Sequence, residues 1–71
     1  MEYIIVKFKD DRAVIIDGEL QGRTNVILEV EEGTHIIRIQ SPPHNFKPSF
    51  RRPTVTGTSL PLPKEVHFEK I

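Results

Sequence analysis

Hydrophobic residues recur at every second position in several short segments of the chain. In the first of these segments, residues 2–8, Ile4, Val6 and Phe8 occupy alternate positions. Successive side chains of a β-strand point to opposite faces, so this spacing predicts a strand with one buried face. Similar runs of branched apolar residues predict further strands over residues 13–16, 26–30, 36–40, 54–58 and 65–69.

Turn-forming residues separate these segments. Asp17 and Gly18 follow the second segment, and both residue types adopt positive φ at low cost, as tight turns require. Gly22 predicts another bend. Gly33, preceded by Glu32, predicts a hairpin turn between two paired strands.

Prolines mark the longer connections. The segment 41–48 holds three of the six prolines and is expected to be a loop. In the segment 60–63, Leu-Pro-Leu-Pro, proline fixes φ and disfavours helix in the residue before it. This segment is therefore expected to be extended and to lead into the last strand.

Alternation in most of the segments predicts two sheets that share one core. We expect a single all-β domain over residues 1–71, a small antiparallel two-layer β-sandwich of about six to seven short strands. A small open β-barrel is the alternative. Ile5, Ile15, Ile27 and Ile36 fall on the faces opposite the expected core, and their exposure would favour a partner or a dimer.

Composition excludes several sources of stability and several locations. The chain contains no cysteine, so neither a disulfide nor a thiolate zinc site holds the fold together. No apolar run approaches the roughly 20 residues of a membrane span. The N-terminal residues lack the basic start and apolar core of a signal peptide, which predicts a cytoplasmic protein, unless the chain is a domain excised from an envelope protein.

Charge is balanced in total and uneven along the chain. Residues 1–32 contain eight acids and four bases, and residues 33–71 contain six bases and two acids. A net charge of zero disfavours strong non-specific binding to nucleic acid or membranes. The uneven distribution is either mixed over the folded surface or forms a dipolar surface, which would suit head-to-tail association or an acidic partner.

The stretch from Val14 to Ile39 resembles the PEGA domain, a small all-β module of bacteria and archaea. In that family a strand ends in Asp-Gly-Glu, a Gly-x-Thr follows, and two strands separated by a glycine turn come next. The matching residues here are Asp17, Gly18, Glu19, Gly22, Thr24, Leu28, Val30, Gly33, His35, Ile37 and Ile39. Asn25 stands where the family usually has proline, and Ser41-Pro42-Pro43 replaces the usual Gly-Tyr.

The resemblance implies an accessory or interaction module without catalytic residues or cofactors. The residues support this expectation, because no serine lies beside a histidine in an identifiable motif and no glycine-rich phosphate loop is present. Glu65, His67 and Glu69 alternate along the last strand and are competent metal ligands. A solvated strand face is the favoured explanation, and we predict neither a metal site nor an enzyme.

The segment 44–52 is the main candidate for partner binding. It mixes aromatic and basic side chains, and the candidate residues are His44, Phe46, Lys47, Phe50, Arg51 and Arg52. Aromatic rings beside cations are typical of proteins that bind single-stranded nucleic acid by stacking and phosphate contact. Phe46 and Phe50 would equally serve to attach a long loop to the core.

Two functional hypotheses remain at this point. The first is a non-catalytic module that binds a protein partner or a second copy of itself, through a sheet edge or the segment 44–52. The second is a small β-barrel that binds single-stranded nucleic acid through the same segment, which the charge balance disfavours. Carbohydrate recognition is a weaker third hypothesis, because the chain has one tyrosine and no tryptophan.

Overall fold

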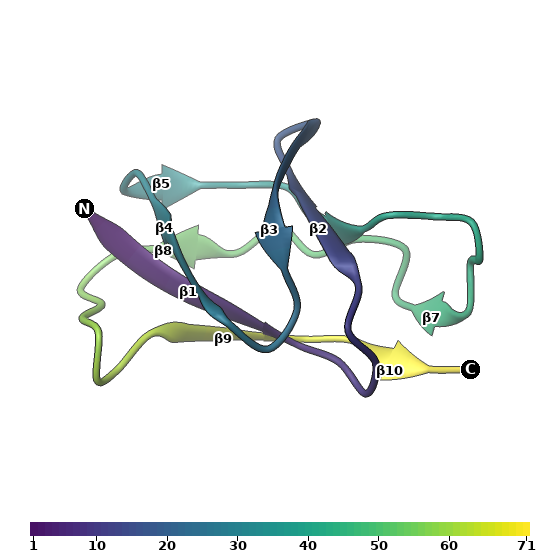
Figure 1. Ribbon diagram of the computed structural model, residues 1–71. Coiled ribbons are helices and arrows are strands. Elements are labelled where there is room, and N and C mark those ends of the chain that lie inside the picture. The colour runs from purple at the N-terminus through teal and green to yellow at the C-terminus, as the bar shows by residue number, and fades with distance from the viewer.

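The fold consists of ten short β-strands and contains no helix (Figure 1). The computed structural model describes residues 1–71. The strands are β1 (Glu2–Lys7), β2 (Ala13–Ile16), β3 (Glu19–Arg23), β4 (Ile27–Val30), β5 (Gly33–Thr34), β6 (Ile37–Ile39), β7 (Phe46–Lys47), β8 (Thr54–Val55), β9 (Lys64–His67) and β10 (Glu69–Lys70). No helix of the length and apolar character needed to cross a membrane is present.

The first layer is built around β1. On one side β1 pairs with β4 in antiparallel orientation, and on the other side it pairs with β9 in parallel orientation. Only Phe68 separates β9 from β10, and the Phe68 N–H donates to the carbonyl of Lys7 (3.0 Å). Because β10 pairs with β7, the layer continues in the order β4-β1-β9/β10-β7.

The second layer is built around β2, which lies between β3 and β6 and is antiparallel to both. β5 and β6 are two parts of one extended segment, since both bond to residues 51–55. The N–H of His35 donates to the carbonyl of Pro53 (3.1 Å), and Ile37 and Arg51 exchange two backbone hydrogen bonds. β5 pairs with β8 in antiparallel orientation, so this layer has the order β3-β2-β6/β5-β8.

Residues from both layers form one hydrophobic core. Alternation along β1, β2, β6 and β9 places one side chain in two between the layers, as the sequence predicts. The core residues are Ile4, Val6, Phe8, Val14, Ile16, Val30, Ile37, Ile39, Phe46, Val55, Val66 and Phe68. The two-layer sandwich is therefore confirmed, and the sheets do not close into a barrel.

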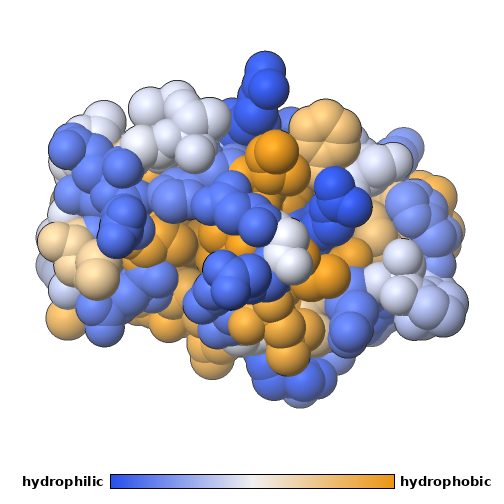
Figure 2. Space-filling model, turned by 90° about the horizontal axis from the view of Figure 1, so that it is seen from above, coloured by the Kyte–Doolittle hydropathy of each residue, from blue (hydrophilic) through white to orange (hydrophobic).

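Apolar side chains also reach the surface. Ile27 and Ile36 are 43% and 38% exposed, whereas Ile5 and Ile15 are half-buried on the outer faces of the sheets. Figure 2 shows apolar atoms between polar side chains on the face seen from above. The expectation that some of these isoleucines are exposed is confirmed, although single exposed apolar residues do not by themselves define an interface.

The predicted hairpin at Glu32-Gly33 is wrong. β4 pairs only with β1, and β5 pairs only with β8, so these residues connect the two layers instead of two paired strands. Glycine is still required at position 33, because the φ of this residue is +132°. The turn chemistry is local, whereas β8, the pairing partner of β5, lies about 20 residues later in the sequence.

The segment 60–63 is not extended, contrary to the prediction. Ser59 and Leu62 exchange two backbone hydrogen bonds, of 3.1 and 3.2 Å, which close a tight turn over Leu60 and Pro61. Pro61 lies at the tip of this turn, where no backbone N–H is needed as a donor, so proline costs no hydrogen bond. The alternation of residues 54–58 and 26–30 is also only partly used, since β8 ends at residue 55 and β4 begins at residue 27.

Candidate functional site

The turn between β2 and β3 explains the Asp-Gly pair of the sequence motif. Asp17 and Gly18 have φ of +52° and +85°, and Ile16 is opposite Glu19, so these two residues form a two-residue hairpin turn. Positive φ at both central positions is the type I′ geometry, which favours Asp-Gly because of its low conformational cost. The predicted structural role of Asp17 and Gly18 is thus backbone geometry.

Thr24 fixes the turn that joins β1 to β2. Its side chain is 3% exposed, and its hydroxyl accepts the N–H of Arg12 (2.9 Å) and donates to the carbonyl of Asp10 (2.7 Å). The Thr24 N–H also donates to the Arg12 carbonyl (2.8 Å). Three hydrogen bonds from one residue therefore hold the turn against the end of β3.

Gly22 and Asn25 complete this part of the motif. A Cβ at Gly22 would lie 2.5 Å from Cδ2 of Leu28, so glycine permits the close approach of β3 to β4. The Asn25 side chain accepts the N–H of Phe8 (3.2 Å) and donates to its carbonyl (2.8 Å). The amide group takes the place of a neighbouring strand here, which gives a structural reason for asparagine at this position.

His35 forms the best-defined polar contact of the surface. Its Nδ1 lies 2.6 Å from Oδ2 of Asp17, and its Nε2 lies 2.6 Å from the carbonyl oxygen of Glu31. Both partners are acceptors, so both ring nitrogens must donate and the ring carries a positive charge. The hydrogen bonds that His35 donates to Asp17 and to the Glu31 carbonyl raise the pKa of His35, and the hydrogen bond from His35 lowers the pKa of Asp17.

The His35 contact predicts that the domain is more stable in mildly acidic than in mildly alkaline solution. A raised folded-state pKa stabilises the fold fully below the unfolded value of about 6.5, and the effect is lost as pH rises through the folded pKa. The lowered pKa of Asp17 stabilises the fold at pH values above its unfolded pKa of about 3.9, so this contribution is the same at pH 5.5 and pH 8. We therefore expect the free energy of unfolding, measured by urea denaturation, to be about 1 kcal/mol higher at pH 5.5 than at pH 8.

The variant His35→Gln should flatten this pH profile, since glutamine cannot carry the charge. His67→Gln is the matched control, because His67 pairs with Glu65 (2.9 Å) on an exposed strand face. A profile that stays steep in His35→Gln and becomes flat in His67→Gln would contradict the assignment.

The candidate residues of segment 44–52 do not form one surface. Phe46 is 2% exposed and packs edge to face against Phe8 and Phe68, with ring centroids 6.3 and 6.0 Å apart. Phe46 is therefore a core residue and presents no ring to a partner. The His44 ring stacks on the Phe46 ring, with the two centroids 4.4 Å apart.

The other members of the segment separate into two groups. Lys47 lies on β7 and pairs with Glu69 at 3.6 Å. Phe50 is 49% exposed and precedes Arg51 and Arg52, which are both exposed. Phe50, Arg51 and Arg52 are thus consecutive and accessible, and the exposed Lys47 lies beside Arg51 in a shallow hollow.

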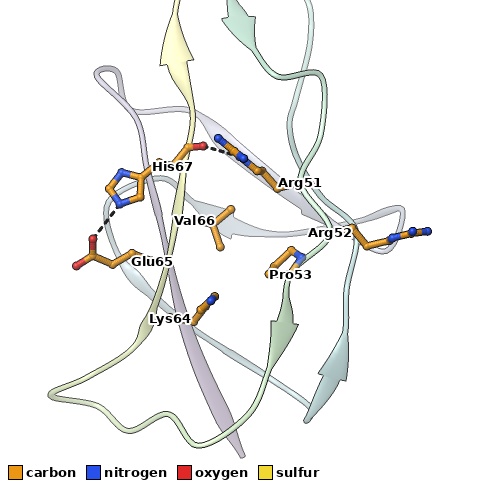
Figure 3. Close-up of a pocket in the computed structure, with 7 residues that line it drawn as sticks. All are labelled: Arg51, Arg52, Pro53, Lys64, Glu65, Val66 and His67. Atoms are coloured by element: carbon orange, nitrogen blue, oxygen red, sulfur yellow. Dashed lines mark hydrogen bonds and ion pairs between the residues drawn. The ribbon is translucent and has the colours of Figure 1, made fainter.

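A groove lies beside Arg51 and Arg52 (Figure 3). It has a volume of about 400 Å³ and is open to solvent. One wall is β9 and the other is the segment before β8; the lining residues are Arg51, Arg52, Pro53, Lys64, Glu65, Val66 and His67. We call this the basic groove. In the sequence, Glu65 and His67 of its β9 wall stand out only as competent metal ligands, and no signal connects them with Arg51 and Arg52.

Both walls of the basic groove are open strand edges. The Phe68 N–H bonds to β1, so by strand alternation the backbone groups of Glu65 and His67 point away from β1 and into the groove. On the opposite wall Arg51 and Pro53 bond to β5 and β6, which leaves the backbone groups of Arg52 pointing outward. The groove therefore presents unpaired backbone groups at Glu65 and Arg52 and the unpaired N–H of His67, whereas the His67 carbonyl accepts a hydrogen bond from Arg51.

Arg51 connects the two walls. Its Nε donates to the carbonyl of His67 (3.0 Å), as Figure 3 shows. Arg51, Arg52 and Lys64 form no ion pair with any carboxylate of the domain. The groove thus holds three cations without acidic partners and one carboxylate, that of Glu65.

The residues considered as metal ligands do not converge. Glu65 bonds to His67, whereas Glu69 pairs with Lys47 on a different strand. No group of three potential ligands comes together in the domain.

Comparison with known families of domains gives one match. A model of the PEGA domain family matches residues 8–65. The chain belongs to the PEGA domain family. Comparison with curated proteins found no match, and comparison with solved structures found none.

The family match gives meaning to the motif residues. PEGA domains are a non-enzymatic family, and the glycines, Asp17 and Thr24 of this PEGA domain shape turns and close contacts. The match extends the resemblance seen in residues 14–39 to residues 8–65, which include Arg51, Arg52 and the start of β9 but not β1.

Proposed function

We propose that this PEGA domain is a non-catalytic protein-interaction module, and that it binds an extended segment of a partner in the basic groove. The supporting observation is the pair of open strand edges, at Glu65 and His67 on one wall and Arg52 on the other. An extended chain would add to β9 as a further strand, with backbone hydrogen bonds giving affinity.

Charge selects the partner in this proposal. Arg51, Arg52 and Lys64 lack acidic partners within the domain, so they favour an acidic segment and would steer its approach. The burial of Phe46 weighs against the nucleic-acid alternative, because one of its two predicted stacking rings is in the core.

The test is an amide-resolved NMR titration with a synthetic peptide of alternating valine and glutamate. We expect shifts in residues 51–54 and 64–67. Glu65→Pro should weaken binding roughly tenfold, because proline removes an outward N–H without touching the bonds to β1. Glu65→Ala is the matched control, since it removes the same carboxylate and retains the N–H.

A parallel titration with a mixed-sequence single-stranded oligonucleotide distinguishes the alternative. Binding of the oligonucleotide that falls steeply with salt, together with no response to the peptide, would overturn the proposal. Equal binding of peptide by Glu65→Pro and Glu65→Ala would show that the strand edge is not used.

A further inference from the structure

A second groove lies on the opposite side of the sandwich and carries the opposite charge. It lies between the outer edges of β3 and β4 and has a volume of about 300 Å³. Asp17, Glu19, Glu29 and Glu31 line it. Asp17 is paired with His35, whereas the other three carboxylates form no ion pair within the domain. We call this the acidic groove.

Topology places the two grooves on opposite sides. In the first layer β1 separates β4 from β9, and in the second layer β2 and β6 separate β3 from the segment 51–55. Each groove is therefore bounded by two edge strands, one from each layer. The acidic groove has the edges of β3 and β4, and the basic groove has the edges of β9 and residues 51–55.

Strand directions make these two sides compatible. β4 is antiparallel to β1, and β9 is parallel to β1, so β4 and β9 run in opposite directions. In the second layer β3 and β6 both oppose β2, and residues 51–55 oppose β6, so β3 and β8 also run in opposite directions. If an equally oriented copy lies alongside, both junctions are antiparallel strand pairs, which two open edges form readily.

We infer that this domain associates head to tail with copies of itself, the acidic groove of one copy docking on the basic groove of the next. The inference rests on the proposed function and names a second copy as the partner. At the first junction the outward backbone groups of Ile27 and Glu29 on β4 face those of Glu65 and the N–H of His67 on β9, whose carbonyl is held by Arg51. The carboxylate of Glu29 then approaches Lys64 or Arg52, which have no partner within their own copy.

The charges also select against other arrangements. Edge strands commonly carry charges that prevent association. Here, two basic grooves repel each other, as do two acidic grooves, so a symmetric dimer through either side is disfavoured. The head-to-tail contact alone joins opposite charges, and because its two surfaces differ, it does not close after two copies.

The association is expected to be weak and dependent on concentration. The domain measures 32 × 22 × 17 Å, and one side offers on the order of 500 Å², below the roughly 800 Å² per partner of a standard interface. Sedimentation velocity at about 0.01 to 1 mM, in low and high salt, should show oligomers that grow with concentration. Salt should weaken them, since the contact depends on exposed charges.

Charge exchange provides the decisive experiment. Arg52→Glu with Lys64→Glu gives a domain with two acidic sides, and Glu19→Lys with Glu29→Lys gives one with two basic sides. Each double variant should remain a monomer, with an association constant at least about tenfold lower, and an equimolar mixture should associate again. Arg38→Glu is the matched control, because Arg38 is exposed on the outer face of β6 and forms no ion pair.

Each other outcome overturns the inference. A domain that stays monomeric at 1 mM in low salt has no such contact. If it nevertheless binds the valine–glutamate peptide in the basic groove, the proposed function stands and only the choice of partner is wrong. Oligomers that stop at a dimer, or that persist in both double variants, would place the contact elsewhere. Circular dichroism of each variant confirms that the fold is retained.

Discussion

Replacing Phe46 by alanine is expected to unfold most of the domain at room temperature. The ring is 2% exposed and lies between the rings of Phe8 and Phe68. Deleting a buried phenylalanine costs about 3–5 kcal/mol, and a domain of this size without disulfides has only a few kcal/mol of stability. Urea denaturation followed by circular dichroism measures the effect. Phe46→Leu, which retains most of the volume, should stay folded and lose about 1–2 kcal/mol.

Phe50→Ala is the matched control for this prediction. Phe50 belongs to the same aromatic and basic segment, but its side chain is 49% exposed. Its removal should change the free energy of unfolding by less than about 0.5 kcal/mol. If the two alanine variants lose similar amounts, Phe46 is not the core residue described above.

Thr24→Val is expected to destabilise the domain by about 2 kcal/mol, although it preserves the shape of the side chain. Valine can neither accept the N–H of Arg12 nor donate to the carbonyl of Asp10. The hydroxyl that both backbone groups contact belongs to Thr24, which is 3% exposed, so water cannot fully replace it. The midpoint of urea denaturation reports the loss.

Thr24→Ser separates the hydroxyl from the methyl group. Serine retains both hydrogen bonds and loses one methyl group, so it should cost only about 0.8 kcal/mol. A serine variant less stable than the valine variant would show that packing dominates at this position. The hydrogen bonds would then be secondary.

Much of the core was predictable because it depends on local alternation. Ile4, Val6 and Phe8 are buried together, as are Ile37 and Ile39, where the period of two predicts them. The Asp17-Gly18 turn was predictable because positive φ at two consecutive positions restricts the residue types.

The missed strands share a physical reason. β3 is exposed at four of its five residues, so it has no hydrophobic alternation and depends on its hydrogen bonds to β2. β7 has two residues and exists through its pairing with β10, 22 positions later at its closest register. Backbone pairing over such separations leaves little trace in the composition of either segment.

The candidate site was predictable only in part for a related reason. Arg51 and Arg52 were singled out because they lie in an aromatic and basic segment. Their neighbours in the groove, from Lys64 to His67, come from a strand that belongs to the other layer. Only the packing of the two layers brings both walls together, and neither segment carries a signal for that contact.

The parallel pairing of β1 with β9 also determines how the domain responds to a pulling force. The first strand begins at one end of the molecule and the last strand ends at the other, as Figure 1 shows. Tension applied to the two termini would slide these strands along each other, loading their hydrogen bonds together instead of opening them one at a time. Within a longer chain under load, the domain would therefore extend late and abruptly, as a mechanical clamp.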